Sequence, residues 1–141
     1  MKKLVIILFI LVTSNHYSNA NIIETIESEK KQCLNTNYLN DNLMSQCNYK
    51  AIEKYNKEID ETIRKLGKNI DRKQYSFLVQ SQNKWDKFIE NDNFLLKNFY
   101  EKDNSLEKEL IISSIQCQNK KYRLEELLIL YHTINNKKFL F

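Results

Sequence analysis

Apolar residues recur every three or four positions in three long stretches of the chain, which is the spacing of one face of an α-helix. The stretches cover residues 43–66, residues 72–100 and a segment that follows EKDN (residues 101–104), and a shorter helix over residues 22–34 is expected before them. Proline is absent and glycine occurs once, whereas the turns of a β-sheet usually need both. Short links make neighbouring helices antiparallel. The sequence therefore predicts an all-α fold, an antiparallel bundle of three long helices plus a short N-terminal helix.

The periodic positions are the residues that we expect to face the core. In the first long helix they are Leu43, Cys47, Ala51, Ile52, Tyr55, Ile59, Ile63 and Leu66. In the second they are Tyr75, Leu78, Val79, Gln82, Trp85, Phe88, Ile89, Leu95 or Leu96, and Phe99. In the third they are Leu106, Leu110, Ile111, Ile115, Tyr122, Leu127, Leu128, Tyr131 and Ile134.

Polar residues mark the ends of these helices. Asn40 or Asp41 can cap the first long helix and Asp71 the second, because a short side-chain oxygen accepts hydrogen bonds from the free N–H groups of the first turn. Asn104 begins the pattern of a capping box at the third. Gly67 follows the last apolar residue of the first long helix and is expected to end it in the left-handed conformation.

The N-terminus has the regions of a secretory signal peptide in their usual order. Two lysines precede an apolar run of nine residues (4–12), and small residues stand at Ser18 and Ala20. A helix that crosses a bilayer needs about 20 apolar residues, so this run is too short to anchor the chain; a buried N-terminal helix is the alternative. We expect residues 1–20 to be removed, which leaves one periplasmic or secreted domain, residues 21–141, with no stable membrane insertion.

The charge of the mature domain is small. The formal net charge of the chain is +4, and removal of the two signal-peptide lysines leaves +2. A nucleic-acid partner usually calls for a concentrated basic face, so we expect none.

All three cysteines lie in the mature domain. An exported chain reaches an oxidising compartment where thiols tend to pair, and three cysteines allow one internal disulfide. Cys33 and Cys47 flank the link between the first two helices, where facing residues approach within disulfide distance, so we expect this pair and a free Cys117. The rival pairing joins Cys47 to Cys117.

No arrangement of residues indicates catalysis, a cofactor or a metal. His132 is the one histidine of the mature domain, and it lies 15 residues from Cys117. That separation is about 22 Å along a single helix, too far for a nucleophile and its base. A zinc site with four ligands would need every cysteine and histidine of the domain. Glu125 and Glu126 are adjacent and therefore point in different directions. We expect a protein that is not an enzyme.

The one tryptophan, Trp85, lies in the middle of the second stripe. The favoured interpretation is packing between helices, with Gln82 as a partner for the indole N–H or as a brace for a facing backbone group. The alternative is an exposed binding residue, since tryptophan is enriched at binding hot spots. In the segment KKYR, we expect the basic residues to face solvent and Tyr122 to face inward, with binding of an acidic surface as the alternative. Arg123 can also be held by a carboxylate of a neighbouring helix.

Five short motifs follow one another along the chain: KKQC, LMSQC, AIEKYNKEI, SQNKW with KF, and a last cysteine followed by RLEEL. This order, over residues 32–131, resembles the lysozyme-inhibitor LprI-like family of small exported bacterial helical domains. The matching positions are Met44 in the Met-x-x-Cys opening, Gln82 and Trp85 in the central motif, and Arg123 as the late arginine. Asn93 stands where that family usually has a cysteine, so the resemblance implies one disulfide fewer and a lone Cys117.

The resemblance implies a protein-binding module that inhibits a lysozyme by covering its cleft, where two carboxylates cleave the sugar bond. Such enzymes are usually basic, so a domain of charge +2 gains no long-range attraction, and the segment IIETIESE (residues 22–29) is the only obvious local acidic patch. The alternative is a periplasmic scaffold, accessory or immunity-type protein with a dedicated partner that is not a lysozyme.

Overall fold

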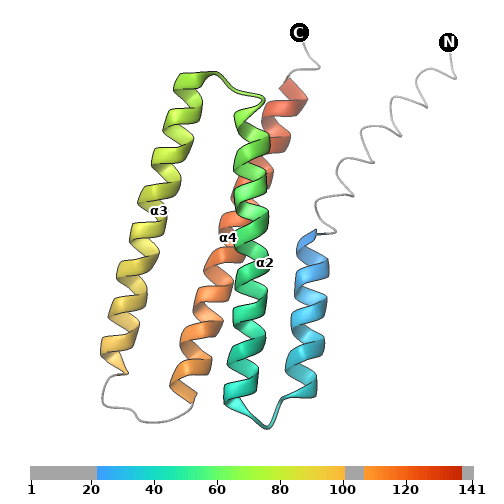
Figure 1. The fold of residues 1–141 in the computed structure, drawn as a ribbon, viewed down its shortest axis with the longest axis vertical. Coiled ribbons are helices and arrows are strands. Elements are labelled where there is room, and N and C mark those ends of the chain that lie inside the picture. Colours follow the sequence, from blue (N-terminus) through green and yellow to red (C-terminus); the bar gives the residue numbers. More distant parts are fainter. Residues whose placement is uncertain (1–21, 101–106, 138–141) are drawn as a thin grey trace, which may run out of the picture.

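The computed structural model describes residues 22–100 and 107–137. These residues form a helix over residues 22–36, called the first helix below, and the helices α2 (Asp41–Gly67), α3 (Arg72–Phe99) and α4 (Glu107–Lys137). The described part contains no strand, so the prediction of an all-α fold is confirmed. Helices that follow one another in the chain run in opposite directions (Figure 1). The predicted signal peptide (residues 1–20), the cap at Asn104 and Leu106 lie outside the described residues.

Two helix starts agree with the sequence analysis. The side chain of Asn40 accepts a hydrogen bond from the backbone N–H of Leu43, so Asn40 rather than Asp41 caps α2. Asp71 caps α3 in a capping box: its carboxylate accepts from the N–H of Gln74, and the Gln74 side chain accepts from the N–H of Asp71. These caps satisfy N–H groups that lack a partner within the helix.

The prediction for Gly67 is wrong. No glycine has a positive φ, and Gly67 is the last helical residue of α2, followed by Lys68 in the right-handed region. A Cβ at Gly67 would lie 2.7 Å from an atom of the Tyr75 ring, which is closer than real side chains approach. The glycine therefore leaves room for an aromatic ring of α3, and the helix ends without a left-handed residue.

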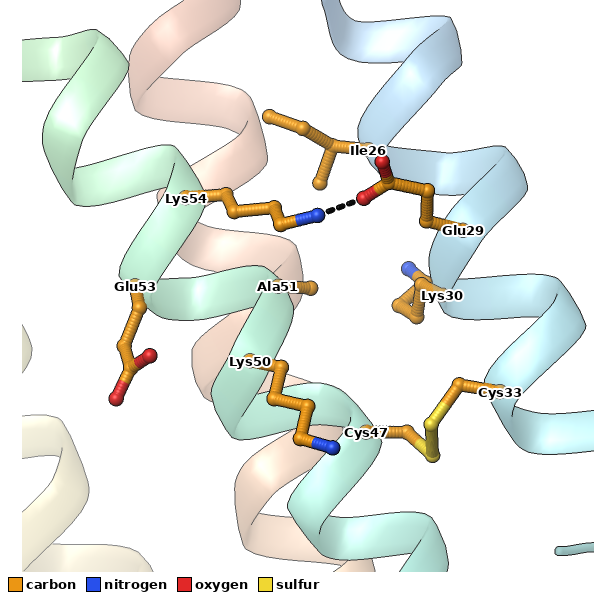
Figure 2. A pocket seen from close by; sticks show the side chains of 9 residues that line it. All are labelled: Ile26, Glu29, Lys30, Cys33, Cys47, Lys50, Ala51, Glu53 and Lys54. Atoms are coloured by element: carbon orange, nitrogen blue, oxygen red, sulfur yellow. Dashed lines mark hydrogen bonds and ion pairs between the residues drawn. A yellow bond between two sulfur atoms is a disulfide. The ribbon is translucent and has the colours of Figure 1, made fainter.

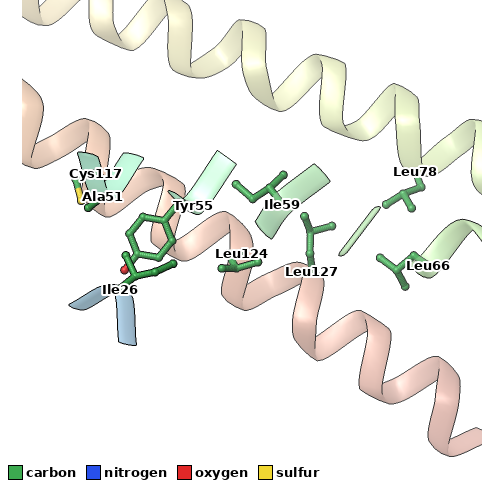
Figure 3. Packing of buried hydrophobic residues seen from close by; sticks show 9 residues of the cluster. All are labelled: Ile26, Ala51, Tyr55, Ile59, Leu66, Leu78, Cys117, Leu124 and Leu127. Carbon is green, nitrogen blue, oxygen red and sulfur yellow. The ribbon is translucent and has the colours of Figure 1, made fainter. Parts of the chain in front are cut away.

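The core lies mainly between α2 and α4, which pack against each other far more extensively than either packs against α3. The first helix adds Ile26, and α3 adds Leu78 (Figure 3). The cluster of buried apolar residues that forms the core comprises Ile26, Ala51, Tyr55, Ile59, Leu66, Leu78, Cys117, Leu124 and Leu127. On α2 the predicted core positions are buried or partly buried except Leu43, which is exposed.

The predicted core face of α3 is only partly correct. Leu78 and Ile89 are buried, and Val79, Gln82, Trp85 and Leu96 are partly buried. Of the alternatives Leu95 and Leu96, Leu96 is thus the one that faces the bundle and Leu95 is exposed; the other predicted positions, Tyr75, Phe88 and Phe99, are exposed. The reason is that α2 and α4 fill most of each other's apolar faces, so α3 contacts the pair along a narrow line and the rest of its apolar surface remains in solvent.

The predicted face of α4 is also partly wrong. Tyr122 is 56% exposed and Ile115 is exposed, whereas Ile112, Cys117 and Leu124 are buried. A buried hydrogen bond between helices accompanies this rotation: Asn48 Nδ2 of α2 donates to Ser113 Oγ of α4 over 3.0 Å. At the C-terminal end the prediction holds: Leu127 is buried, and Leu128, Tyr131 and Ile134 pack against the core cluster.

A disulfide joins the first helix to α2. Cys33 and Cys47 are bonded with their Cα atoms 5.7 Å apart, as predicted, and Cys117 is a free, buried thiol. Burial raises the pKa of the Cys117 thiol, although the Lys30 ammonium group opposes this. Lys30 Nζ lies 3.9 Å from Cys117 Sγ. The thiol therefore stays protonated near neutral pH and is a poor nucleophile.

Peptide mapping without reduction should recover Cys33 linked to Cys47 and Cys117 unlinked. Cys117 should react with an alkylating reagent quickly in denaturant and slowly in the folded protein, because it is 1% exposed. The double variant Cys33→Ser with Cys47→Ser should lose about 3 kcal/mol of unfolding free energy, the expected effect of opening a loop of this length. A peptide that links Cys117 to either other cysteine would contradict the assignment.

Candidate functional site

Three residues singled out by the sequence meet where α3 faces α4. Arg123 of α4 is 9% exposed, and its Nε donates a hydrogen bond to Gln82 Oε1 of α3 over 2.9 Å. The guanidinium carbon of Arg123 lies 5.7 Å from the centre of the Trp85 ring. A cation over an aromatic face is an attractive contact, and it strengthens as water is removed.

Further charged residues extend this contact. Lys120 Nζ lies 4.9 Å from the centre of the Trp85 ring and 3.5 Å from Asp86 Oδ1. Gln82 Nε2 donates to Asp86 Oδ2 over 3.2 Å, and Arg123 Nη1 donates to Glu126 Oε2 over 3.1 Å. We call this group the Arg123 cluster; it comprises Gln82, Trp85, Asp86, Lys120, Arg123 and Glu126.

The Arg123 cluster fastens α3 to α4. Trp85 is partly buried, as the packing interpretation predicts, but two cations of α4 lie over its ring. Gln82 binds Arg123, a role that was not predicted. Arg123 is held by an amide of the neighbouring helix and a carboxylate of its own helix. The interpretation of KKYR is inverted, because Tyr122 points to solvent while Lys120 and Arg123 reach toward α3.

Two other residues of the resemblance lie outside this cluster. Met44 is in the first turn of α2, one turn before Cys47, and is partly buried. Asn93 lines a shallow hollow of about 410 Å³ between α3 and α4, and its Oδ1 is buried without a hydrogen-bond partner in the described part of the chain.

The outer face of α3 carries a strip of exposed apolar side chains. Phe77, Phe88, Leu95 and Phe99 are 58%, 58%, 54% and 76% exposed. At 3.6 residues per turn these four side chains point within about 40° of one another, over about 33 Å of helix. We call these four residues the outer strip. The sequence analysis placed Phe88 and Phe99 in the core and offered Leu95 as an alternative to Leu96, although the buried line of Leu78 and Ile89 lies about 100° away around the helix.

A hollow of about 210 Å³ lies between the first helix and α2 beside the disulfide (Figure 2). It is lined by Ile26, Glu29, Lys30, Cys33, Cys47, Lys50, Ala51, Glu53 and Lys54. The ammonium group of Lys54 forms an ion pair with the Glu29 carboxylate across it. This pair closes part of the opening.

The acidic segment near the N-terminus is engaged inside the protein. The Tyr55 hydroxyl donates to Glu27 Oε1 over 2.5 Å, Lys30 Nζ lies 2.7 Å from the same oxygen, and Lys121 Nζ lies 3.7 Å from Glu27 Oε2. Because Glu29 is paired with Lys54 as well, two of the three glutamates between residues 22 and 29 are neutralised. The segment is therefore a poor acidic patch for a basic partner.

These contacts change the acidity of two groups. Partial burial alone would raise the pKa of Glu27, but the hydrogen bonds from Lys30 and Tyr55 and the charges of Lys30 and Lys121 hold it below the usual 4.5. Burial first, and the Glu27 carboxylate second, raise the pKa of Tyr55, so its hydroxyl remains a donor. Glu27 is thus a carboxylate that the fold keeps ionised.

Within residues 22–100 and 107–137, no three His, Cys, Asp or Glu side chains gather as a metal site would require. None of the helices in that part combines the length and the apolar composition needed to cross a membrane.

Comparison with known proteins gives no relative. No protein-family model matches the chain, and no curated protein and no solved structure matches it significantly. The resemblance to the LprI-like family remains a prediction from the motifs.

Truncation of Trp85 should weaken the attachment of α3. Trp85→Ala should lower the unfolding free energy by about 2–3 kcal/mol, somewhat less than for a fully buried tryptophan. Phe88→Ala, one turn further along the exposed face, is the control and should change it by less than about 0.5 kcal/mol. Urea unfolding measures both. Equal stability of the two variants, with loss of partner binding in Trp85→Ala, would favour the binding interpretation of Trp85.

The Glu27 contacts predict a pH dependence of stability. A carboxyl group with a lowered folded pKa stabilises the protein above its unfolded pKa of about 4.5, and this contribution is lost as the pH falls through the folded pKa. Glu27→Gln should therefore cost about 1–2 kcal/mol at pH 7, the range for hydrogen bonds to a charged group, and almost nothing at pH 2. Thermal unfolding across this range measures the difference.

The control is Glu61→Gln. Hydrogen bonding by Arg64 lowers the pKa of Glu61 too, but this pair is on the surface, so its variant should be nearly as stable as the wild type. A Glu27→Gln variant whose deficit persists unchanged at pH 2 would contradict the assignment.

Proposed function

We propose that the chain is an exported protein-binding module that inhibits a lysozyme by covering its cleft. The single observation that supports protein binding is the exposure of the four apolar side chains of the outer strip. Several large apolar side chains exposed along one face of a helix are typical of an interaction site. Four such side chains follow one helix face, and none of them is needed to fill the core. The inhibitory part rests on the resemblance to the LprI-like family, and export rests on the predicted signal peptide.

The way α3 is held supports this proposal. A neighbouring side of the helix, about 100° around the axis from the outer strip, is fixed by buried Leu78 and Ile89 and by the Arg123 cluster, and the start of the helix is fixed by the capping box at Asp71. A binding surface on a helix that is already ordered loses little conformational entropy on association. The outer strip can therefore contact a partner without rearrangement of the bundle.

The distribution of charge favours α3 over the first helix as the binding surface. Glu27 and Glu29 are engaged by lysines and by Tyr55, so the acidic segment offers little attraction to a basic enzyme. Binding through the outer strip depends instead on removal of apolar surface from water, which needs no net charge difference. A mature charge of +2 is compatible with such an interface.

The purified mature protein should slow the clearing of cell walls by a lysozyme at a stoichiometric ratio. The enzymes tested should include lysozymes of several classes. A double variant, Phe88→Ser with Leu95→Ser, should inhibit at least about tenfold less well, because central apolar contacts dominate binding energy. Its circular dichroism and melting temperature should match the wild type, since both side chains are exposed.

Failure of the wild-type protein to slow any of these enzymes, even in large excess, would overturn the proposed function. An envelope protein of another kind that binds the wild type and not the double variant would then identify the domain as a scaffold or immunity-type protein.

A further inference from the structure

Lysines border the outer strip on one side. Lys84 points about 20° from Phe77 and 40° from Phe88 around the helix axis, and Lys73 and Lys87 lie further round on the same side. All three are exposed, and within the described ranges none of them forms an ion pair. Their ammonium groups are therefore available to a partner that covers the strip.

Among the described residues of α3, no acidic side chain lies on this border. Asp92 lies on the opposite border. Asp86 is turned toward α4, where it pairs with Lys120, and it also accepts a hydrogen bond from Gln82 of its own helix. The surface that a partner meets is thus apolar along its middle and positive along one edge.

Lys84 lies inside the length of the strip and not at its end. It is about 10 Å along the axis from Phe77 and about 6 Å from Phe88. A partner that packs against both phenyl rings must also remove water from the Lys84 ammonium group. Such a charge is costly to bury unless an anionic group replaces the lost water. The matching surface is therefore apolar and carries a carboxylate near its centre.

The cleft of a lysozyme supplies such a carboxylate. Glycoside hydrolases of this kind carry two carboxyl groups about 5–9.5 Å apart in the groove that holds the sugar chain. Lys84 and Lys87 are one helical turn apart, so two ammonium groups can face two carboxyl groups. We propose that α3 lies along the cleft, with Lys84 paired to a catalytic carboxylate and Lys87 beside it. This inference rests on the proposed function, because it specifies how the same surface acts.

A second copy of the chain fits the strip less well. In an antiparallel pair of α3 helices related by a twofold axis, each border meets the same border of the other copy. The Lys87 side chains, next to the centre of the strip, would then approach each other. Like charges across such a contact are unfavourable.

A double-mutant cycle tests the pairing. Binding is measured by titration calorimetry for the wild-type chain and Lys84→Gln, each against the inhibited lysozyme and against its variant with the catalytic carboxylate changed to the amide. With unmodified enzyme, Lys84→Gln should weaken binding at least about 30-fold, the usual loss when a desolvated charge loses its partner. With the amide enzyme the same substitution should change binding by less than about threefold, because the partner charge is already gone.

Lys57→Gln, the same change at an exposed lysine of α2, is the control and should leave binding unchanged. If the wild type binds lysozyme but Lys84→Gln behaves like Lys57→Gln, the inference fails and the proposed function stands. If the wild type binds no lysozyme, both fail. A monomer–dimer equilibrium that Phe88→Ser abolishes and Lys87→Gln strengthens would overturn the inference in favour of a second copy.

Discussion

The hydroxyl of Tyr55 is buried where the first helix, α2 and α4 meet, and a buried hydroxyl must have a hydrogen-bond partner. Glu27 of the first helix supplies the acceptor, and Lys30 and Lys121 compensate its charge. One polar contact therefore attaches a short helix that has little core of its own. The disulfide between Cys33 and Cys47 joins the first helix to α2 near the link between them. The disulfide and the hydrogen bond from Tyr55 to Glu27 therefore hold the same two helices together.

The packing of α2 on α4 determines how much apolar surface remains for α3 to pack against. Because the first helix and α4 cover most of the apolar face of α2, α3 is attached along a narrow line of Leu78, Ile89 and the Arg123 cluster. In this cluster, cations of α4 lie over the Trp85 ring and Arg123 binds the amide of Gln82. These polar contacts stand in place of a broad apolar contact between α3 and α4. The apolar side chains of the outer strip then remain in solvent, and this exposure suggests a partner.

The sequence predicts the helices, their caps and the disulfide because these depend on neighbours in the chain. The cap at Asn40 and the capping box at Asp71 are local signals, and the disulfide follows from the short link between two helices. The rotation of α4 is not local. Apolar residues lie on several of its faces, and the hydrogen bond from Asn48 to Ser113, 65 residues apart, belongs to the contact that decides which face is buried. Gly67 was misread because its role depends on the Tyr75 ring of the next helix.

For the same reason, only those features of the candidate site that lie within one helix were predictable. The sequence places Gln82 and Trp85 on one face of α3. Their contact with Arg123 depends on how α3 packs against α4, and a periodic pattern in the sequence does not specify that packing. The exposure of Phe88, which sequence reasoning placed in the core, is a consequence of how little of α3 the other helices cover.

The central claim is that Leu78, Ile89 and the Arg123 cluster fix α3 to the bundle and that the outer strip binds a partner. Amide hydrogen exchange of the mature protein, measured with and without a stoichiometric lysozyme, tests it most directly. The account predicts added protection confined to α3 between residues 77 and 99, with α2 and the first helix unchanged. Added protection in the first helix or α2, with α3 unaffected, would contradict it.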